Sequence, residues 1–461
     1  MEPSSSVDAF VIEDLGQQKL QARYLTALVR RTGLRIRLID LNDGVDAIVA
    51  LAKRATPRLI VSSILFADRV DEILALMTAL RGVCPRAHLA LAGHLPAFAS
   101  TELRAACPAL DSISAQSLIS NLDSLPFPAR DDGIAAYLGY GFATVEASRG
   151  CYHACAFCLP SAFYRAHGAP YRLRGIANLV DEIEALYQQG ARLFLFDDEQ
   201  FLPPKPARAE RVTAFADELA RRDLRIAFTI KCRADDVDET LFRYLKEIGL
   251  LRVYVGIESG SGMTLELLNK RVTPQQNADA LAMLDSLGIV ADFHVLFFHP
   301  WSTLETIQTE SAFLESILPR CSTAFDFCEV EIYPGTLFAR RARAEGKCGT
   351  DAWQMPYTVA DPRAELLRRL CRVVFGTLFA QSREALTRAW FAQLLARRFR
   401  PTVSDDDRAR ELKVLAARAN REALAVWREM LTFADGEKAF DASRVNARAS
   451  AWATRLDMLR R

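Results

Sequence analysis

The chain has 461 residues, half of them hydrophobic and a quarter charged, which is enough apolar material to bury about three domain cores. Its formal net charge of +1 gives no argument for binding nucleic acid or an anionic surface. No apolar run reaches the roughly 18 residues that a membrane span needs. The sequence therefore predicts neither a nucleic-acid partner nor a membrane partner.

The first residues, Met-Glu-Pro-Ser-Ser-Ser, have neither the basic nor the apolar region of a secretory signal. Most of the ten cysteines are scattered along the chain, which does not suggest a disulfide framework, and a reducing compartment keeps such thiols free. We therefore expect a cytoplasmic protein. The scattered cysteines are Cys84, Cys107, Cys232, Cys321, Cys328, Cys348 and Cys371.

The N-terminal part alternates short apolar runs with helical stretches. The predicted helices include residues 17–31 and 70–81, and the predicted strands are residues 7–13, 34–41, 58–64, 87–92 and 110–113. This order is typical of a doubly wound, Rossmann-like α/β domain. We assign it to residues 1–132 and expect a ligand at the carboxyl ends of the strands.

Three segments of this domain, residues 58–65, 92–94 and 125–131, resemble the cobalamin (B12)-binding domain of many radical S-adenosylmethionine (SAM) proteins. The resemblance makes cobalamin a candidate cofactor. Two departures describe a degenerate domain: no Asp-x-His-x-x-Gly stretch supplies a lower axial histidine, and the segment before Leu125 is short. His94 has an alternative interpretation as an ordinary loop histidine, which we favour.

Three cysteines stand close together in the run Cys151-Tyr-His-Ala-Cys155-Ala-Phe157-Cys158. Three thiolates from one loop suit a [4Fe-4S] cluster and leave one iron without a protein ligand. With Phe157 before the last cysteine, the run resembles the signature of the radical SAM enzymes. The alternatives are three unrelated buried thiols and a structural zinc site, but zinc usually takes two pairs of ligands, and His153 lies inside the same short loop.

The resemblance implies a chemistry. SAM chelates the open iron, and one electron splits it into methionine and a 5′-deoxyadenosyl radical that removes hydrogen from an unactivated carbon. An electron donor such as flavodoxin or ferredoxin is then expected as a partner.

A strand-then-helix unit repeats six times from about Tyr137. This repeat resembles the partial (β/α)6 barrel of the radical SAM core, which we assign to residues 133–340. Asp238 is predicted to cap one of its helices and Gly249 to end it. The cysteine loop follows the first strand, at the carboxyl end where barrel active sites lie. The six predicted strands are residues 142–148, 192–196, 225–233, 251–257, 291–298 and 328–332.

Segments after the second, third and fourth strands resemble the SAM-binding motifs of the family. The acidic segment suits the amino group of SAM, Arg233 its carboxylate, and Glu258 or Ser259 its ribose hydroxyls. The structural alternatives are a helix N-cap for the acidic segment and an internal Arg233–Glu258 ion pair. The assigned residues, besides Phe157, are Asp197, Asp198, Glu199, Lys231, Arg233, Gly256, Glu258 and Ser259.

Side-chain alternation places a polar set inside the last two strands of the barrel. This set suits the hydroxyl or amine groups of a small-molecule substrate and could move protons. His294 has an alternative interpretation as a core histidine. The candidate catalytic residues are Asp292, His294, Glu329, Glu331 and Tyr333.

Residues 341–461 are predicted to be a helical C-terminal domain, with a linker at residues 401–407. For the whole chain we expect dehydration, epimerisation or rearrangement of a sugar-like or natural-product biosynthetic intermediate. The alternative is a cobalamin-dependent radical SAM C-methyltransferase. A remote alternative is a non-catalytic iron–sulfur electron carrier or sensor, which would not need a barrel lined with polar residues.

Overall fold

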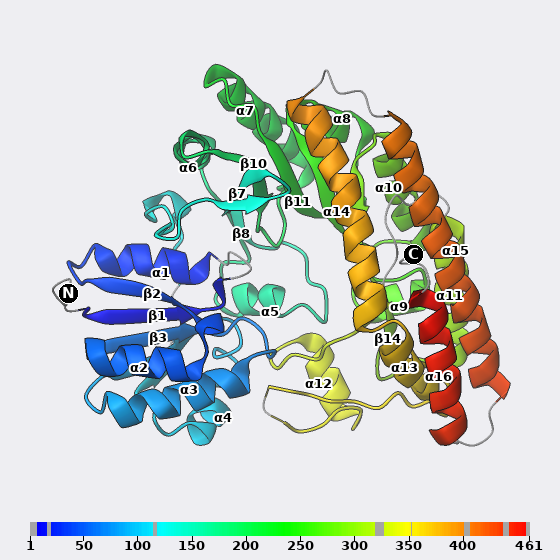
Figure 1. Ribbon diagram of the computed structural model, residues 1–461, viewed down its shortest axis with the longest axis horizontal. Coiled ribbons are helices and arrows are strands. Elements are labelled where there is room, and N and C mark those ends of the chain that lie inside the picture. The colour runs from blue at the N-terminus through cyan, green and yellow to red at the C-terminus, as the bar shows by residue number, and fades with distance from the viewer. Residues whose placement is uncertain are drawn as a thin grey trace. The chain divides into compact units, whose positions relative to one another are not determined.

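The computed structural model describes residues 7–15, 20–113, 118–318, 327–351, 353–400, 406–436 and 442–457 (Figure 1). The chain forms two compact units: residues 1–199 with 332–356, and residues 200–331 with 357–461. These units do not follow the three-domain division expected from the sequence, which stays a prediction. None of the described helices combines the length and the apolar character that crossing a membrane requires.

The first unit begins with a parallel five-stranded sheet in the order β2-β1-β3-β4-β5. Figure 1 shows α1 on one side of this sheet and α2 and α3 on the other, so the predicted doubly wound domain is confirmed. The strands are β1 Ala9–Glu13, β2 Ile36–Asp40, β3 Leu59–Ser63, β4 His88–Ala92 and β5 Ser112–Ile113. The helices are α1 Gln21–Arg30, α2 Val45–Ala55, α3 Val70–Val83 and α4 Ser100–Ala106.

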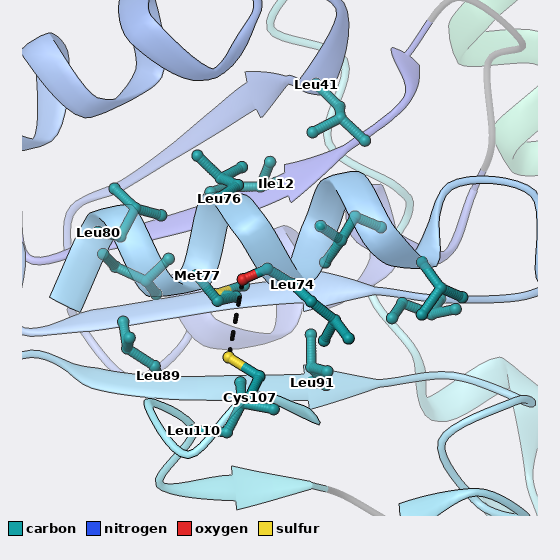
Figure 2. Close-up of a cluster of buried hydrophobic side chains, with 14 of the residues drawn as sticks. Ile12, Leu41, Leu74, Leu76, Met77, Leu80, Leu89, Leu91, Cys107 and Leu110 are labelled. Atoms are coloured by element: carbon teal, nitrogen blue, oxygen red, sulfur yellow. Dashed lines mark hydrogen bonds between the residues drawn. The ribbon is translucent and has the colours of Figure 1, made fainter. Parts of the chain in front are cut away.

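The core of this domain forms because its central strands are covered on both faces. Every residue of β1 is buried, as expected for a parallel strand between two helical layers. Figure 2 shows Leu74, Met77 and Leu80 of α3 gathered over Leu89 and Leu91 of β4. Full burial of such a side chain contributes about 1.5–3 kcal/mol.

The rest of the first unit carries the start of the radical SAM-like segment. β10 (Ala191–Phe196) pairs in parallel with β7 (Tyr140–Val145), and β6 (Ala135–Tyr137) adds an antiparallel strand to β7. Leu138 and Gly139 between β6 and β7 both have positive φ, 52° and 81°, as a two-residue type I′ hairpin turn needs. The other elements are β8 Ser148–Gly150, β9 Tyr171–Leu173, α5 Leu159–Ala166, α6 Ile176–Gln188 and α12 Leu337–Ala344.

The second unit continues the strand–helix alternation. β11 (Ala227–Arg233), β12 (Leu250–Gly256) and β13 (Val290–Asp292) are parallel neighbours, and β14 (Val295–Phe298) pairs with β15 (Phe327–Glu329). The helices are α7 Arg208–Arg221, α8 Glu239–Ile248, α9 Gly262–Leu267, α10 Pro274–Ser286, α11 Leu304–Ile317, α13 Pro362–Val374, α14 Thr377–Phe399, α15 Asp406–Gly436 and α16 Ala442–Asp457.

The predicted ends of α8 are confirmed. The Asp238 side chain accepts a hydrogen bond from the Leu241 N–H at 2.9 Å, so it satisfies one of the free donors of the first turn. Gly249 ends the helix with φ +127°, a conformation that glycine tolerates best. Most of the predicted 401–407 linker lies outside the described residues.

Three strand predictions are wrong. The strand expected over residues 142–148 ends at Val145, and Ser148 begins β8, which pairs with β9. The strand expected over residues 291–298 is two strands, because β13 pairs with β12 whereas β14 pairs with β15, and Phe293 and His294 lie where the ladder changes partner. The strand expected over residues 328–332 ends at Glu329. Alternation therefore does not extend across any of these predicted strands.

Candidate functional site

The three cysteines of the predicted cluster motif lie between β8 and the start of α5, in the first unit. Cys151, Cys155 and Cys158 are all partly exposed and form no disulfide. The Cys158 N–H donates to the Cys155 carbonyl at 3.3 Å. Burial raises the pKa of Cys158, and so does the charge of nearby Cys155 and Cys151. The three thiols thus lie in one short loop and are available as ligands.

The described residues present no preformed site for a single metal ion. In the described part of the chain no three His, Cys, Asp or Glu side chains converge on a single metal-ion position. A structural zinc site needs such convergence, whereas the cysteines of a cubane cluster bind different iron atoms. His153, the candidate fourth zinc ligand, packs its ring on that of Tyr152 at 4.3 Å between centroids.

The helix that follows the loop holds it in shape. Arg165 of α5 donates to the carbonyls of Tyr152 at 2.7 Å and His153 at 3.0 Å. The Ser161 hydroxyl also donates to the His153 carbonyl, at 2.8 Å. Loop carbonyls thus stay bonded to α5, which leaves the cysteine side chains to act as ligands.

The acidic segment after β10 accepts hydrogen bonds from the residues that lead into the cysteine loop. Asp198 is fully buried and accepts hydrogen bonds from the Ala147 N–H, at 3.1 Å, and the Ser148 hydroxyl. Burial raises the pKa of Asp198 to about 7. Glu199 accepts from the Gly150 N–H at 2.8 Å. No helix begins within residues 197–204, so the helix N-cap alternative is wrong.

These contacts separate the three predicted SAM carboxylates by environment. The buried carboxylate of Asp198 accepts hydrogen bonds from Ala147 and Ser148 of the chain itself, whereas Asp197 and Glu199 are partly exposed. Phe157, which we also assigned to the SAM site, is partly exposed as well. The assignment of this segment to SAM stays a prediction, with Asp197 and Glu199 better placed for a ligand than Asp198.

The third-strand residues lie in the second unit. Arg233 is buried, pairs with Asp235 at 2.8 Å and donates to the Lys270 carbonyl. Glu258 pairs instead with the Lys270 ammonium at 3.0 Å. The internal ion-pair alternative is therefore confirmed for both residues, although their partners are Asp235 and Lys270 and not each other. Lys231, two residues before Arg233 on β11, is half-buried.

The end of β12 is shaped for the Lys270–Glu258 pair. A Cβ on Gly256 would meet the Lys270 Nζ at 2.8 Å and the Glu258 Oε1 at 2.9 Å. Glu258 itself has φ +62°, rare for a residue with a side chain. Such strain persists only where the surrounding structure enforces it, and here Glu258 also bonds through its N–H to the His294 carbonyl at 3.1 Å.

Ser259 belongs to a buried network that the sequence did not reveal. Its hydroxyl donates to Glu310 of α11, and the Gly260 N–H donates to the same carboxylate at 2.6 Å. Ser259 is fully buried and Glu310 is 2% exposed. The one sequence signal for Glu310 is its helical spacing from Ile307 and Leu314, which puts a carboxylate on the apolar face of α11.

Two of the five candidate catalytic residues are neutralised by arginines. Asp292 is buried in an ion pair with Arg252. Glu329 accepts from Arg368 at 2.8 Å and from Arg372 at 2.6 Å, both on α13. Burial alone would raise the pKa of Glu329, but the hydrogen bonds from Arg372 and Arg368 outweigh burial and lower this pKa.

The other three do not share one strand face. His294 is exposed, with its Nδ1 2.9 Å from the Cys328 Sγ, so the core-histidine alternative is wrong. Glu331 is exposed beyond the end of β15. Tyr333 belongs to the first unit, where its ring packs on Phe66 at 5.6 Å.

The carboxyl end of β4 carries another feature that the sequence only hinted at. His94 lies in the turn after β4, as a loop histidine would, but it is 4% exposed and its ring packs on that of Phe163 at 4.5 Å. Its Nδ1 has no hydrogen-bond partner among the described residues. A buried nitrogen without a partner, at the edge where such domains bind ligands, fits a group that brings a polar atom to it.

We predict that Cys151→Ala, Cys155→Ala and Cys158→Ala each lose iron and sulfide after anaerobic reconstitution, because each would remove one cluster ligand. Iron and sulfide analysis is the measurement. Cys348→Ala is the matched control, since Cys348 is also partly exposed but lies far along the chain. A loop variant that keeps full iron would remove that cysteine from the site.

Comparison with known proteins agrees with these features. The family model for the Radical SAM superfamily matches residues 145–309, and that for the B12 binding domain matches residues 17–117. An uncharacterized methyltransferase, PH0819, of Pyrococcus horikoshii is 30% identical over 257 residues, which are 54% of this chain and 53% of that protein. The chain thus spans about half the length of this curated relative.

Solved structures show the same fold at low identity. The cobalamin-dependent SAM radical enzyme OxsB with aqua-cobalamin bound gives a TM-score of 0.65 at 16% identity, over 97% of this chain and 84% of that chain. The radical SAM methyltransferase TsrM of Kitasatospora setae, with cobalamin and a [4Fe-4S] cluster bound, gives 0.57 at 17% identity, over 74% and 75%. The predicted fold class is confirmed. The chain therefore carries two segments of known family, a B12 binding domain at residues 17–117 and a Radical SAM superfamily segment at residues 145–309.

Proposed function

We propose that this protein is a cobalamin-dependent radical SAM methyltransferase acting on a carbon atom of a small polar molecule. The observation that carries the proposal is the first unit, in which a B12-binding domain and a three-cysteine cluster loop belong to one compact body. The word methyltransferase in the names of PH0819 and TsrM supports it. Both fold matches described above are to cobalamin-bound enzymes.

In this proposal a bound cluster and SAM supply a carbon-centred radical, and a bound corrinoid supplies a transferable methyl group. The chain's own residues bind and orient these groups. Cys151, Cys155 and Cys158 hold the cluster, and the acidic segment at Asp197 and Glu199 holds the SAM ammonium. An external one-electron donor such as flavodoxin or ferredoxin is part of the proposal.

We also assign Arg233 and Glu258 to SAM. Arg233 offers a buried cation for the SAM carboxylate, and Glu258 offers an acceptor for ribose hydroxyls, because its side chain is 17% exposed whereas Ser259 is fully buried. His294 and Glu331, the two exposed members of the predicted catalytic set, are the groups we assign to substrate. An imidazole and a carboxylate there would bind hydroxyl or amine groups and move protons.

Dehydration, epimerisation or rearrangement, which the sequence had favoured, becomes the second candidate. It shares the cluster and SAM but does not need the B12-binding domain. The comparisons support the methyl-transfer alternative better. An electron carrier or sensor would need neither a B12-binding domain nor the polar groups of the second unit.

The two candidate reactions predict different products from SAM. We expect S-adenosylhomocysteine to form in anaerobic, reduced protein only when cobalamin is present, because methyl transfer consumes SAM as the methyl donor. Liquid chromatography with mass detection, using SAM with a deuterated methyl group, measures it. If cobalamin made no difference and 5′-deoxyadenosine were the sole product, the rearrangement candidate would replace this one.

A further prediction concerns Arg233. Arg233→Ala should weaken SAM binding, since losing a buried charged contact typically costs about 2–5 kcal/mol, while iron content stays unchanged. Calorimetric titration of SAM is the measurement, and Arg243→Ala, an exposed arginine on α8, is the control. Unchanged SAM affinity would assign Arg233 to its ion pair with Asp235 alone.

A further inference from the structure

Three cationic or polar side chains gather around the ring of Tyr164 on α5. The Arg172 guanidinium carbon lies 5.2 Å from the centre of that ring, and the His94 ring lies 5.3 Å from it. Arg149 of β8 is the register partner of Arg172 on β9. Burial and the charge of Arg149 together lower the pKa of His94 to about 3, so the imidazole is neutral. We call His94, Arg149, Arg172 and Tyr164 the Tyr164 cluster.

The cluster concentrates buried polar atoms that have no hydrogen-bond partner among the described residues, and those of its two arginines are donors. The Arg149 Nη2, the Arg172 Nε and Nη2, and the His94 Nδ1 are all buried without a hydrogen-bond partner among the described residues. Buried polar atoms nearly always have a partner in native proteins. Four such atoms on three adjoining side chains indicate a place where a ligand brings the missing hydrogen-bond partners.

Each guanidinium group is hydrogen-bonded through one of its nitrogens, and it has at least one other buried nitrogen without a partner among the described residues. The Arg149 Nε donates to Glu146 at 2.8 Å, and the Arg172 Nη1 donates to the Ile119 carbonyl at 2.5 Å. The Arg149 guanidinium also lies over the Tyr24 ring, 4.5 Å from its centre. Both guanidinium groups are thereby held in place with unbonded N–H groups, which is how a binding site is preorganised.

The location identifies the ligand class. His94 follows β4, at the edge of the N-terminal sheet where doubly wound domains bind ligands. A Cβ on Gly93 would meet the Ile64 carbonyl oxygen at 2.1 Å, so this turn packs tightly on the turn after β3 and fixes His94. Arg149 precedes Cys151 by two residues, and Tyr164 lies on the helix that follows Cys158. The cluster therefore adjoins both the B12-binding domain and the cysteine loop.

Arginine side chains are donors only, so the ligand must present oxygen acceptors. The family match of the domain that carries His94 points to one such ligand. A corrinoid brings the required acceptors, with amide carbonyls on its rim and a phosphodiester in its nucleotide tail. We propose that the Tyr164 cluster binds the oxygen-rich periphery of a corrinoid and so couples that cofactor to the cysteine loop. This inference rests on the proposed function, since it needs a bound corrinoid.

The test is cobalamin affinity of the full-length, anaerobically reconstituted protein, followed by absorbance titration with hydroxocobalamin. Arg172→Met keeps an unbranched apolar stem but removes every donor, and it should weaken cobalamin binding by about tenfold or more. His94→Phe keeps the aromatic packing and should weaken it by a smaller factor. Arg58→Met, an exposed arginine beside β3, should bind like the parent protein. Unchanged iron content in each variant shows that the cysteine loop is intact.

Two further probes identify the oxygen atoms. Cobinamide lacks the nucleotide phosphate, so equal weakening of cobinamide and cobalamin by Arg172→Met assigns the amide carbonyls, and weakening of cobalamin alone assigns the phosphate. Either result supports the proposal. Inorganic phosphate that binds the parent protein without competing with cobalamin, and is lost in Arg172→Met, would assign the cluster to an anionic substrate and overturn it.

The same measurements distinguish a failure of this inference from a failure of the proposed function. If the parent protein binds cobalamin and Arg172→Met binds it equally well, this inference fails and the proposed function stands. If the parent protein binds no corrinoid, the proposed methyl transfer fails, and the inference fails with it.

Discussion

The buried carboxylate of Asp198 is the contact on which the cluster site depends. It holds the backbone of Ala147 and the hydroxyl of Ser148, while Glu199 holds the Gly150 N–H directly before the first cysteine. Burying a carboxylate is costly unless hydrogen bonds satisfy it, and the raised pKa of Asp198 records that cost. The parallel pairing of β7 and β10 makes the contact possible, because it brings the ends of both strands to one edge.

The B12-binding domain and the cysteine loop pack into one hydrophobic core and are not merely joined by a linker. Leu159, next to Cys158, belongs to the same buried cluster as the leucines of the N-terminal sheet. The chain returns to this unit at residues 332–356, where Tyr333 packs on Phe66 and the Phe338 N–H donates to the Ala156 carbonyl at 2.9 Å. A ligand bound at the edge of the sheet would therefore affect the position of the loop that holds the cluster, because both belong to one packed core.

Much of this could be predicted from local sequence. Strands of a parallel sheet are buried on both faces and appear as short apolar runs, so the five N-terminal strands were placed to within about two residues. The three-cysteine motif and the cap at Asp238 are equally local signals. Each depends on residues that are neighbours in the chain, which one sequence shows directly.

What could not be predicted depends on partners far along the chain. Alternation along a strand gives the face of a side chain but not the point where the ladder changes partner, and this is why the break at His294 was missed. The charge pairs Arg252–Asp292 and Arg368–Glu329 join segments 40 and 39 residues apart. Nothing in the local pattern of Glu329 distinguishes a carboxylate neutralised by helix α13 from one that faces a substrate.

The central claim is that three cysteines hold a cluster whose fourth iron is open to SAM. Electron paramagnetic resonance of the anaerobically reduced protein, recorded with and without SAM, tests it most directly. The account predicts about four irons per chain, a reduced-cluster signal that changes when SAM is added, and loss of that signal in Cys155→Ala. Zinc in place of iron, or a cluster signal that SAM leaves unchanged, would contradict it.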